Sequence, residues 1–303
     1  MDGVLVIDKP QGLTSHDVVA AARRRLGERR IGHTGTLDPL ATGVLPLACG
    51  RATRLVRFLS SSEKDYEARI RFGIETDSLD VTGAVVARSD RQPARADVEA
   101  AIVSLRGHYL QMPPAYSAKK VAGRRAYAAA RARDEVTLAP VPVHVVRAEL
   151  CAFEGDAARV ALTCSAGFYV RSFAQELGRR VGTGACLDAL RRTRSGEFTI
   201  DTAVGLEALG AIAVDEGAPL IALDRLLPDL PRVRLTETGR VRVSHGQPVD
   251  ARHMADGPSG AGISEGAAGP GAWVRLFDER NQLVAMAQPG SAPGSLHPAV
   301  VLA

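Results

Sequence analysis

The spacing of hydrophobic residues changes along the chain, and each period predicts a different element. The uninterrupted apolar run over residues 4–7 is typical of a buried strand, and a turn with proline and glycine follows it. Apolar residues then recur at helical spacing between Ser15, a candidate N-cap, and Leu26, which precedes a glycine. We therefore expect a strand over 4–7 and a helix over 15–26.

Alternation between apolar and polar positions predicts strands further along. Residues 66–72 place Tyr66 and three other apolar side chains on one face and charged side chains on the other. Residues 160–164 repeat this alternation, and helical spacing begins at about Arg171. Near the end, two apolar runs flank a polar turn over residues 278–282 and predict a β-hairpin. Strands and helices mix without regular βαβ alternation, which favours an α+β fold over a parallel α/β sheet.

Two irregular segments suggest how the chain is divided. Residues 227–231 contain two prolines and indicate a domain boundary. Residues 255–272 consist almost entirely of Gly, Ala, Ser and Pro, which is typical of a flexible loop. We therefore expect one large domain over residues 1–230 and a small domain, with the hairpin, over residues 231–303.

The composition excludes several classes of protein. Of the 303 residues, 46% are hydrophobic and 24% are charged, as in an ordinary soluble globular protein. No apolar stretch reaches 18 residues, so we expect no membrane span and a soluble, intracellular protein. The four cysteines are far apart and form no metal-ligand pattern, which argues against a structural zinc site.

Basic residues are concentrated in two segments, although the formal net charge is only +4. Residues 117–133 contain six bases and no acid, and five arginines lie within residues 23–30. Such clusters are typical of a surface that contacts phosphates, but a solvated helix face produces the same pattern. The six bases are Lys119, Lys120, Arg124, Arg125, Arg131 and Arg133.

The stretch over residues 32–43 is too rich in Gly, Thr and Pro for a regular element and predicts a structured loop. It presents one carboxylate, Asp38, between glycines and directly before Pro39, which restricts the backbone. An aspartate that caps a turn has the same pattern. A phosphate-binding loop is a weaker interpretation, because no Gly-Lys-Ser/Thr follows. A hydrolase using His33 and Asp38 is weaker still, because the loop has no second carboxylate at ligand spacing.

Five blocks of sequence resemble the TruB-type pseudouridine synthases, in that family's order. The loop reads GHTGTLDPLATG, almost residue for residue the active-site loop of those enzymes. The other blocks are VLVIDKPQGLTSHDVV, KDYEARIRFG, MPPAYSAKKVAGRRAY and GFYVRSFAQELG, which begin at positions 4, 64, 112 and 167. The blocks are distributed over residues 4–178. The resemblance implies a mixed, mainly antiparallel catalytic domain with flanking helices and a small β-rich, PUA-like domain at the end.

The resemblance also implies roles for individual residues. Asp38 matches the catalytic aspartate, Tyr66 the tyrosine that stacks on the target base, and Arg171 the arginine that pairs with the carboxylate. The uridine pocket would be lined by Tyr169 and Leu190. Three further matches are His33, which would contact the RNA loop, and Lys9 and Pro10, which would pack near the site. On their own patterns, Tyr66, Tyr169 and Leu190 would be core residues, and His33 a hydrogen-bonding loop residue.

The family reaction breaks one C–N bond and forms one C–C bond without redox change, so it implies no cofactor and no metal. The implied activity is isomerisation of the T-loop uridine at tRNA position 55, in the cytoplasm, by a monomer. A basic insertion over about residues 117–147, with Lys119, Lys120, Arg124 and Arg125 on the RNA backbone, would grip the tRNA. A different hypothesis is a tRNA-binding folding factor in which catalysis is incidental.

Overall fold

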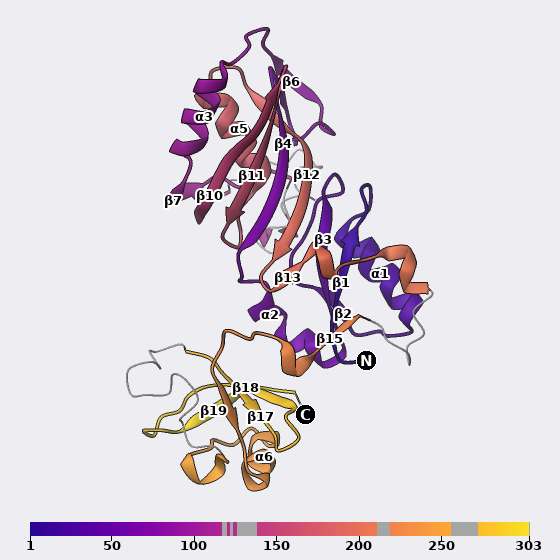
Figure 1. Ribbon diagram of the computed structural model, residues 1–303, viewed down its shortest axis with the longest axis vertical. Helices are drawn as coiled ribbons and strands as arrows, with labels where there is room; N and C mark the ends of the chain where they lie inside the picture. The colour runs from indigo at the N-terminus through magenta and orange to yellow at the C-terminus, as the bar shows by residue number, and fades with distance from the viewer. Residues whose placement is uncertain (117–119, 122–123, 126–137, 211–218, 256–271, 303) are drawn as a thin grey trace.

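A long mixed sheet forms most of the computed structural model, and a second, smaller sheet lies at its end (Figure 1). The structure describes residues 1–116, 120–121, 124–125, 138–210, 219–255 and 272–302. Within them, the large sheet has 11 strands, eight of them in the order β14-β1-β3-β12-β4-β11-β10-β7. All its pairs are antiparallel except β1–β14 and β3–β12, so the sheet is mixed and mainly antiparallel.

The long strands lie in the middle of the sheet, and the shorter ones lie at its ends or pair with only part of a longer strand. In the large sheet they are β1 Gly3–Lys9, β2 Ile31–His33, β3 Thr42–Cys49, β4 Lys64–Phe72, β7 Gly107–Gln111, β10 Val141–Glu154, β11 Ala157–Cys164, β12 Ala185–Ser195, β13 Phe198–Thr199, β14 Val204–Gly205 and β15 Leu220–Ala222. Two separate pairs are β5 Ile74–Thr76 with β6 Val85–Arg88, and β8 Lys120–Val121 with β9 Arg124–Arg125.

The described helices do not all lie on this sheet, because α1, α3 and α5 pack against it in two groups whereas α6 packs against the small sheet. Figure 1 shows α3 and α5 together against the β10–β12 half, and α1 against β1 and β3. Their bounds are α1 Ser15–Leu26, α2 Val56–Leu59, α3 Arg95–Ser104, α5 Val170–Arg180 and α6 Glu237–Ser244. Short 3-10 turns are η1 Gly50–Leu55, η2 Ile200–Thr202, η3 Leu206–Gly210, η4 Leu223–Arg225 and η5 Ala251–His253.

Helix α1 spans the predicted residues, but its N-cap lies one residue before the predicted one. The N-cap is Thr14, not Ser15. The Thr14 hydroxyl accepts a hydrogen bond from the Asp17 backbone N–H, and the Asp17 carboxylate accepts one from the Thr14 backbone N–H. Ser15 is instead buried, and its hydroxyl bonds the backbone of Leu37 in the site loop. Ser15, the predicted cap, therefore links the helix to that loop instead of capping it.

The smaller sheet has the order β16-β17-β18-β19, and the predicted hairpin is its central pair β17–β18. Its strands are β16 Arg232–Arg234, β17 Val274–Phe277, β18 Leu283–Pro289 and β19 Leu296–Val301. Val4 and Val6 of β1 pack against Leu283 and Met286 of this sheet, whereas Leu5 and Ile7 face the core under α1. Strand β1 is thus buried on both faces, which explains its unbroken apolar run.

The α+β class and the mainly antiparallel architecture with a small β-rich end are confirmed. The predicted strands and helices at residues 4–7, 15–26, 66–72 and 160–164 and from Arg171 are present. The loop predicted over 32–43 is irregular only between β2 and β3, because both of its ends pair in the sheet. Most of residues 255–272 lie outside the described residues, and the boundary at 227–231 stays a prediction.

Candidate active site

The loop between β2 and β3 is held in place by the segment that joins β1 to α1. The Gly12 backbone N–H donates to the Pro39 carbonyl at 2.8 Å, and the Leu37 N–H donates to the Ser15 hydroxyl at 2.8 Å. Within the loop, the Ala41 N–H donates to the Asp38 carbonyl at 3.0 Å, which closes a tight turn. These bonds fix the backbone on both sides of Asp38, so its side chain is presented from a rigid turn.

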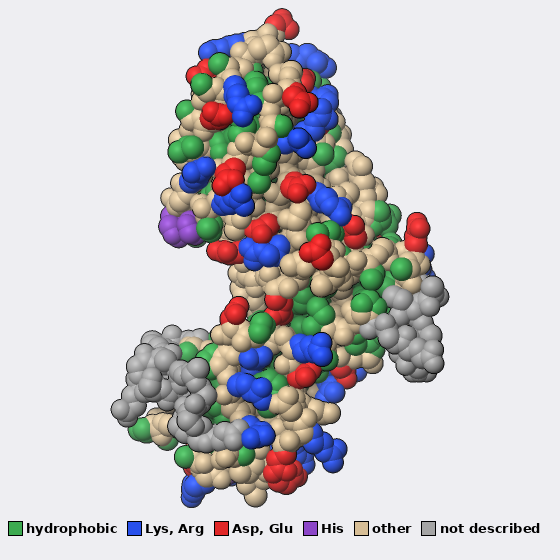
Figure 2. Space-filling view, in the orientation of Figure 1, with side chains coloured by type: hydrophobic (Ala, Val, Ile, Leu, Met, Phe, Trp, Pro, Cys, Tyr) green, Lys and Arg blue, Asp and Glu red, His purple; other side chains and the backbone are tan. Residues whose placement is uncertain are grey.

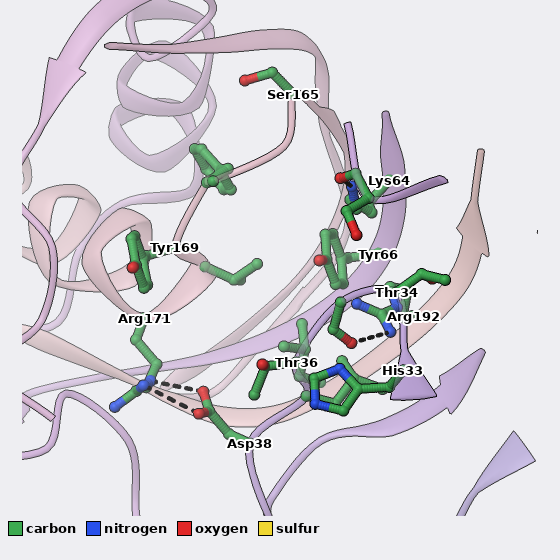
Figure 3. A pocket seen from close by; sticks show the side chains of 17 residues that line it. His33, Thr34, Thr36, Asp38, Lys64, Tyr66, Ser165, Tyr169, Arg171 and Arg192 are labelled. Atoms are coloured by element: carbon green, nitrogen blue, oxygen red, sulfur yellow. Dashed lines mark hydrogen bonds and ion pairs between the residues drawn. The ribbon is translucent and has the colours of Figure 1, made fainter. Parts of the chain in front are cut away.

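Asp38 is joined by two contacts to Arg171 in the first turn of α5. Arg171 Nε lies 2.9 Å from Asp38 Oδ2, and Nη2 donates to Oδ1 at 3.1 Å (Figure 3). The guanidinium is only 6% exposed, whereas the carboxylate is 39% exposed. A cation at a helix N-terminus is unfavourable for the helix dipole, so a specific anion must hold it there. The predicted pairing of these two residues is therefore present, with the carboxylate as its accessible member.

A second carboxylate, Asp80, lies behind this pair and was not expected from the sequence. Its Oδ2 is 4.0 Å from Arg171 Nη1, and the side chain is 7% exposed. Asp80 also accepts from the Ser78 and Thr82 side chains, and Arg171 Nη1 donates to the Ser78 carbonyl at 3.1 Å. Asp80 therefore helps to orient the guanidinium without reaching the open side of the site. The stretch from position 77 to 83 reads as an ordinary polar turn, so only its burial reveals the role.

We call Asp38, Arg171 and Asp80 the paired wall; the opposite side of the cleft is formed by Lys64, Tyr66 and Arg192. Lys64 and Tyr66 are two residues apart on β4 and therefore share a face, and Arg192 on β12 is in register with Tyr66. Lys64, Tyr66 and Arg192 are 6%, 9% and 1% exposed. We call these three residues the carbonyl-held wall.

The two cations of the carbonyl-held wall bond to backbone carbonyls. Arg192 Nε donates to the Val44 carbonyl at 2.7 Å, and Nη2 donates to the Gly35 carbonyl at 3.1 Å. Lys64 Nζ donates to the carbonyl of Ser60 at 2.7 Å and to that of Ser62. In the part of the chain that the structure describes, no ion pair joins either cation to a carboxylate. Neither residue was among the predicted site residues, because each reads as a charged position on a strand.

The remaining predicted residues line the same cleft, whose volume is about 360 Å³. Tyr169 is fixed through its backbone, because its N–H donates to Gln111 Oε1 at 2.8 Å and its carbonyl accepts from Gln111 Nε2 at 3.0 Å. Leu190 is 8% exposed and presents one edge to the opening. His33 lies at the rim, with its ring edge-to-face against His16 at 5.4 Å between centroids. Gln111 is a positioning residue that the sequence did not reveal.

Figure 3 shows how the two walls face each other. Asp38 and Arg171 lie on one side, and Tyr66 and Arg192 lie across the opening, with Thr36 and His33 along its edge. The residues come from β2 and its following loop, β4, β12 and the start of α5. The fold therefore brings Asp38, Tyr66, Arg171, His33, Tyr169 and Leu190 into one cleft.

The charges of the site are set mainly by burial. Burial raises the pKa of the Asp38 carboxyl, Arg171 opposes the rise, and the Asp80 carboxylate adds to it. Burial also raises the pKa of the Tyr66 phenol, against the neighbouring Arg192 guanidinium, so the hydroxyl is protonated at neutral pH. Burial, and to a smaller extent the charge of Arg192, lower the pKa of Lys64 to about 8.

Of the four basic residues predicted to bind the RNA backbone, three belong to strands that the structure describes and one does not. Lys119 lies outside the described residues, and Lys120, Arg124 and Arg125 belong to the short antiparallel pair β8–β9. Among the described residues, no three His, Cys, Asp or Glu side chains form a group that could hold a metal ion. None of the described helices combines the length and the apolar character that crossing a membrane requires.

Two family models match consecutive parts of the chain. The TruB family pseudouridylate synthase (N terminal domain) model matches residues 23–170, and the tRNA pseudouridylate synthase B C-terminal domain model matches residues 171–232. A tRNA pseudouridine synthase B from Solibacter usitatus is 42% identical over the whole of both chains. The chain belongs to the TruB family. One from Aromatoleum aromaticum is 46% identical over 78% of this chain and 77% of its own.

Solved structures place this TruB-family chain among the pseudouridine synthase folds. It superimposes on a chain of a Cbf5-Nop10-Gar1 complex with a TM-score of 0.74 and 25% identity, over 99% of this chain and 85% of that chain. A chain of an H/ACA RNP bound to a substrate RNA containing 2′-deoxyuridine gives the same TM-score at 24% identity, with the same coverage. Membership of the TruB family makes the chain a pseudouridine synthase, which is an isomerase.

Proposed function

We propose that this pseudouridine synthase isomerises the uridine at position 55 in the T loop of tRNA, with Asp38 as nucleophile. The observation that carries the proposal is an accessible carboxylate, held by Arg171, in a cleft that also contains Tyr66. Relatives of similar length are named tRNA pseudouridine synthase B, which supports tRNA as the substrate. The rest of the proposal follows from what the reaction demands of such a cleft.

The reaction detaches the base and reattaches it through a different atom. The C1′–N1 bond breaks, a C1′–C5 bond forms, the proton on C5 is lost and N1 gains one, so no electrons are gained or lost. Asp38 supplies the carboxylate for a covalent intermediate, and Arg171 orients it and favours its ionised form. The Asp38 carboxylate could bond to the sugar or to the base, and both possibilities need it in the same place.

Tyr66 and Tyr169 are proposed to hold the base while it is detached, because both line the cleft. A uracil stacked on the Tyr66 ring would gain about 1–3 kcal/mol. Because the Tyr66 hydroxyl is protonated at neutral pH, we assign it to stacking and hydrogen-bond donation rather than to removal of the C5 proton. The apolar edge of Leu190 helps to exclude water, which would otherwise hydrolyse the detached sugar.

A T-loop uridine reaches such a cleft only when it leaves the base stack, which costs a few kcal/mol. The proposed compensation is binding energy from the basic segment, with Lys119, Lys120, Arg124 and Arg125 on RNA phosphates. The small sheet β16–β19 is proposed to act as a PUA-like RNA-binding domain in the cytoplasmic enzyme. These assignments extend the proposal beyond the cleft itself.

The test is to replace Asp38 with Asn and map pseudouridine in a tRNA transcript. We expect the wild-type protein to form pseudouridine at position 55. With Asp38→Asn, the rate of its formation should fall by about 10⁴-fold or more. Binding of the tRNA should stay within a few-fold. Asp156→Asn, at an exposed turn after β10, is the matched control and should keep the wild-type rate. Wild-type rates in Asp38→Asn would reject the nucleophile, and pseudouridine at another position would reject the substrate. Retained binding with no isomerisation by the wild type would favour a folding factor.

A further inference from the structure

Two buried cations in the cleft have no part in the mechanism described so far. Lys64 and Arg192 are 6% and 1% exposed, and both line the cleft beside Tyr66. They are also close to each other, because a Cβ at Gly35 would lie 3.5 Å from Arg192 Nη1 and 4.0 Å from Lys64 Cε. The site therefore holds two like charges together under a base-stacking tyrosine.

Neutral carbonyls only partly offset the cost of burying these charges. A buried charge is expensive unless it is paired, and two neighbouring cations repel each other. Arg171, across the cleft, has Asp38 and Asp80 as partners, whereas no carboxylate among the described residues forms an ion pair with Lys64 or Arg192. An anion that enters the cleft would supply the missing negative charge.

The chemistry of the base supplies such an anion for a short time. When the C1′–N1 bond breaks, its electron pair stays on the base and spreads over the ring and its carbonyl oxygens. This charge disappears when C5 bonds to C1′ and loses its proton, while N1 gains one. Donors fixed beforehand stabilise a developing charge more than donors that must reorganise. The carbonyl bonds of Lys64 and Arg192 fix them in this way.

A phosphate of the RNA backbone is the other anion that could meet these cations, and their depth argues against it. A phosphate stays on the strand outside the cleft and is normally met by exposed side chains. Lys64 and Arg192 share the face of the sheet with Tyr66, the residue proposed to stack on the base. A planar base in the cleft is therefore better placed to meet them.

We propose that Lys64 and Arg192 stabilise the negative charge that develops on the uracil ring while it is detached from the ribose. This inference rests on the proposed isomerisation of uridine and assigns its electrostatic part to the carbonyl-held wall. Tyr66 then holds the ring, Asp38 holds the sugar or the base covalently, and the two cations favour departure of the base. Lys9 is fully buried nearby but does not line the cleft, so it has no such role.

The experiment compares uridine with 5-fluorouridine at the target position of a T-arm RNA. Fluorine withdraws electrons, so the fluorinated anion is intrinsically more stable and needs less help from the protein. The loss of the N-glycoside is measured in single turnovers with the full chain, in wild type, Lys64→Met and Arg192→Lys. We expect each variant to cleave the uridine substrate about 10²-fold more slowly. With 5-fluorouridine, the loss should be at least five-fold smaller, on the order of 20-fold or less.

Controls separate this inference from its alternatives. Lys9→Met removes a buried cation outside the cleft and should slow both substrates by the same factor. Equal losses for both substrates in Lys64→Met would overturn the inference. The inference would also be overturned if a variant bound an RNA without the target base more weakly and its slope of log affinity against log salt concentration fell by about one per cation removed. That result would identify a phosphate contact. If Arg192→Lys does not fold, the two substrates are compared with Lys64→Met and Lys64→Arg alone. A wild-type protein that forms no pseudouridine in the T arm would overturn the proposed function instead.

Discussion

The two walls of the cleft hold their charges in opposite ways. On the paired wall, Arg171 contacts the side chain of Asp38 at 2.9 Å and has Asp80 behind it. On the carbonyl-held wall, Lys64 and Arg192 contact backbone oxygens of neighbouring segments, among them those of Ser60 and of Val44 in β3. A guanidinium neutralised by carboxylates can orient one of them, whereas a cation held by neutral carbonyls keeps its charge available to a ligand. The difference suggests that one wall positions the nucleophile and the other receives the charge of the leaving base.

After the loss expected for Asp38→Asn, the largest effect is expected from Arg171→Lys, which tests whether the paired wall works by geometry. A lysine keeps the charge but cannot make the two-point contact of a planar guanidinium. We expect the single-turnover rate of pseudouridine formation to fall about 10³-fold. Arg179→Lys, on the same helix but 71% exposed, should keep the wild-type rate. A rate within ten-fold of wild type in Arg171→Lys would mean that charge alone is sufficient on this wall.

Gly43→Ala tests whether the carbonyl-held wall depends on the fit of its backbone. Gly43 has φ 98°, and a Cβ there would lie 2.2 Å from the Arg192 carbonyl oxygen where β3 meets β12. We expect the free energy of unfolding in urea to fall by about 3 kcal/mol, from overpacking and backbone strain together. Gly12 has φ 90° with open space around it, so Gly12→Ala should cost only about 1 kcal/mol. Equal losses in the two variants would show that the β3–β12 contact is not tight.

The buried lysine of the carbonyl-held wall should be visible in the pH dependence of stability. The Lys64 pKa is about 8 in the folded protein and 10.5 when unperturbed, so the unfolded chain binds the extra proton between these values. Lys64 therefore makes the free energy of unfolding rise by about 3 kcal/mol, mostly between pH 8 and pH 10.5, and contributes little pH dependence well below pH 8. We expect Lys64→Met to lose this rise, as measured by urea unfolding at pH 7 and pH 10.5. Cysteine and tyrosine titrations are common to both proteins, so a wild-type-like rise in Lys64→Met would contradict the prediction.

The sequence predicts one wall of the cleft much better than the other. Asp38 and Arg171 lie in recognisable blocks, and the unfavourable position of Arg171 at a helix start already indicates an anionic partner. Lys64 and Arg192 give no such signal, because a charged residue in a strand is usually exposed. Lys64 shares the face of Tyr66 because it lies two residues away on β4, whereas Arg192 is brought to Tyr66 only by the register of β4 and β12, which sequence periodicity does not fix.

The fold shows the same division between local and long-range information. The alternation over residues 66–72 predicts β4, and the helix after Thr14 differs by a single residue at its cap. The partnership of β3 with β12, which is parallel and joins residues about 150 positions apart, cannot be read from local patterns. Asp80 is hidden for the same reason, because its burial comes from a bridge to Leu187 on β12. Local periodicity therefore gives the elements, and the site emerges from their pairing.

The smallest effect is expected from Asp80→Asn, which removes one charge from the paired wall and keeps its shape. The proposed mechanism requires ionised Asp38, whose pKa is raised above its usual value of 3.8, so the rate should fall as the pH drops through that raised pKa. The Asp80 carboxylate contributes to the rise, so its removal should move this acid limb to lower pH, by less than about one unit. The measurement is a pH–rate profile in single turnovers, with folding checked at each pH. Asp77→Asn, a nearby exposed residue, should leave the limb in place. A limb that moves to higher pH in Asp80→Asn would mean that Asp80 acts chiefly by orienting Arg171, because a misplaced guanidinium no longer favours the ionised form of Asp38.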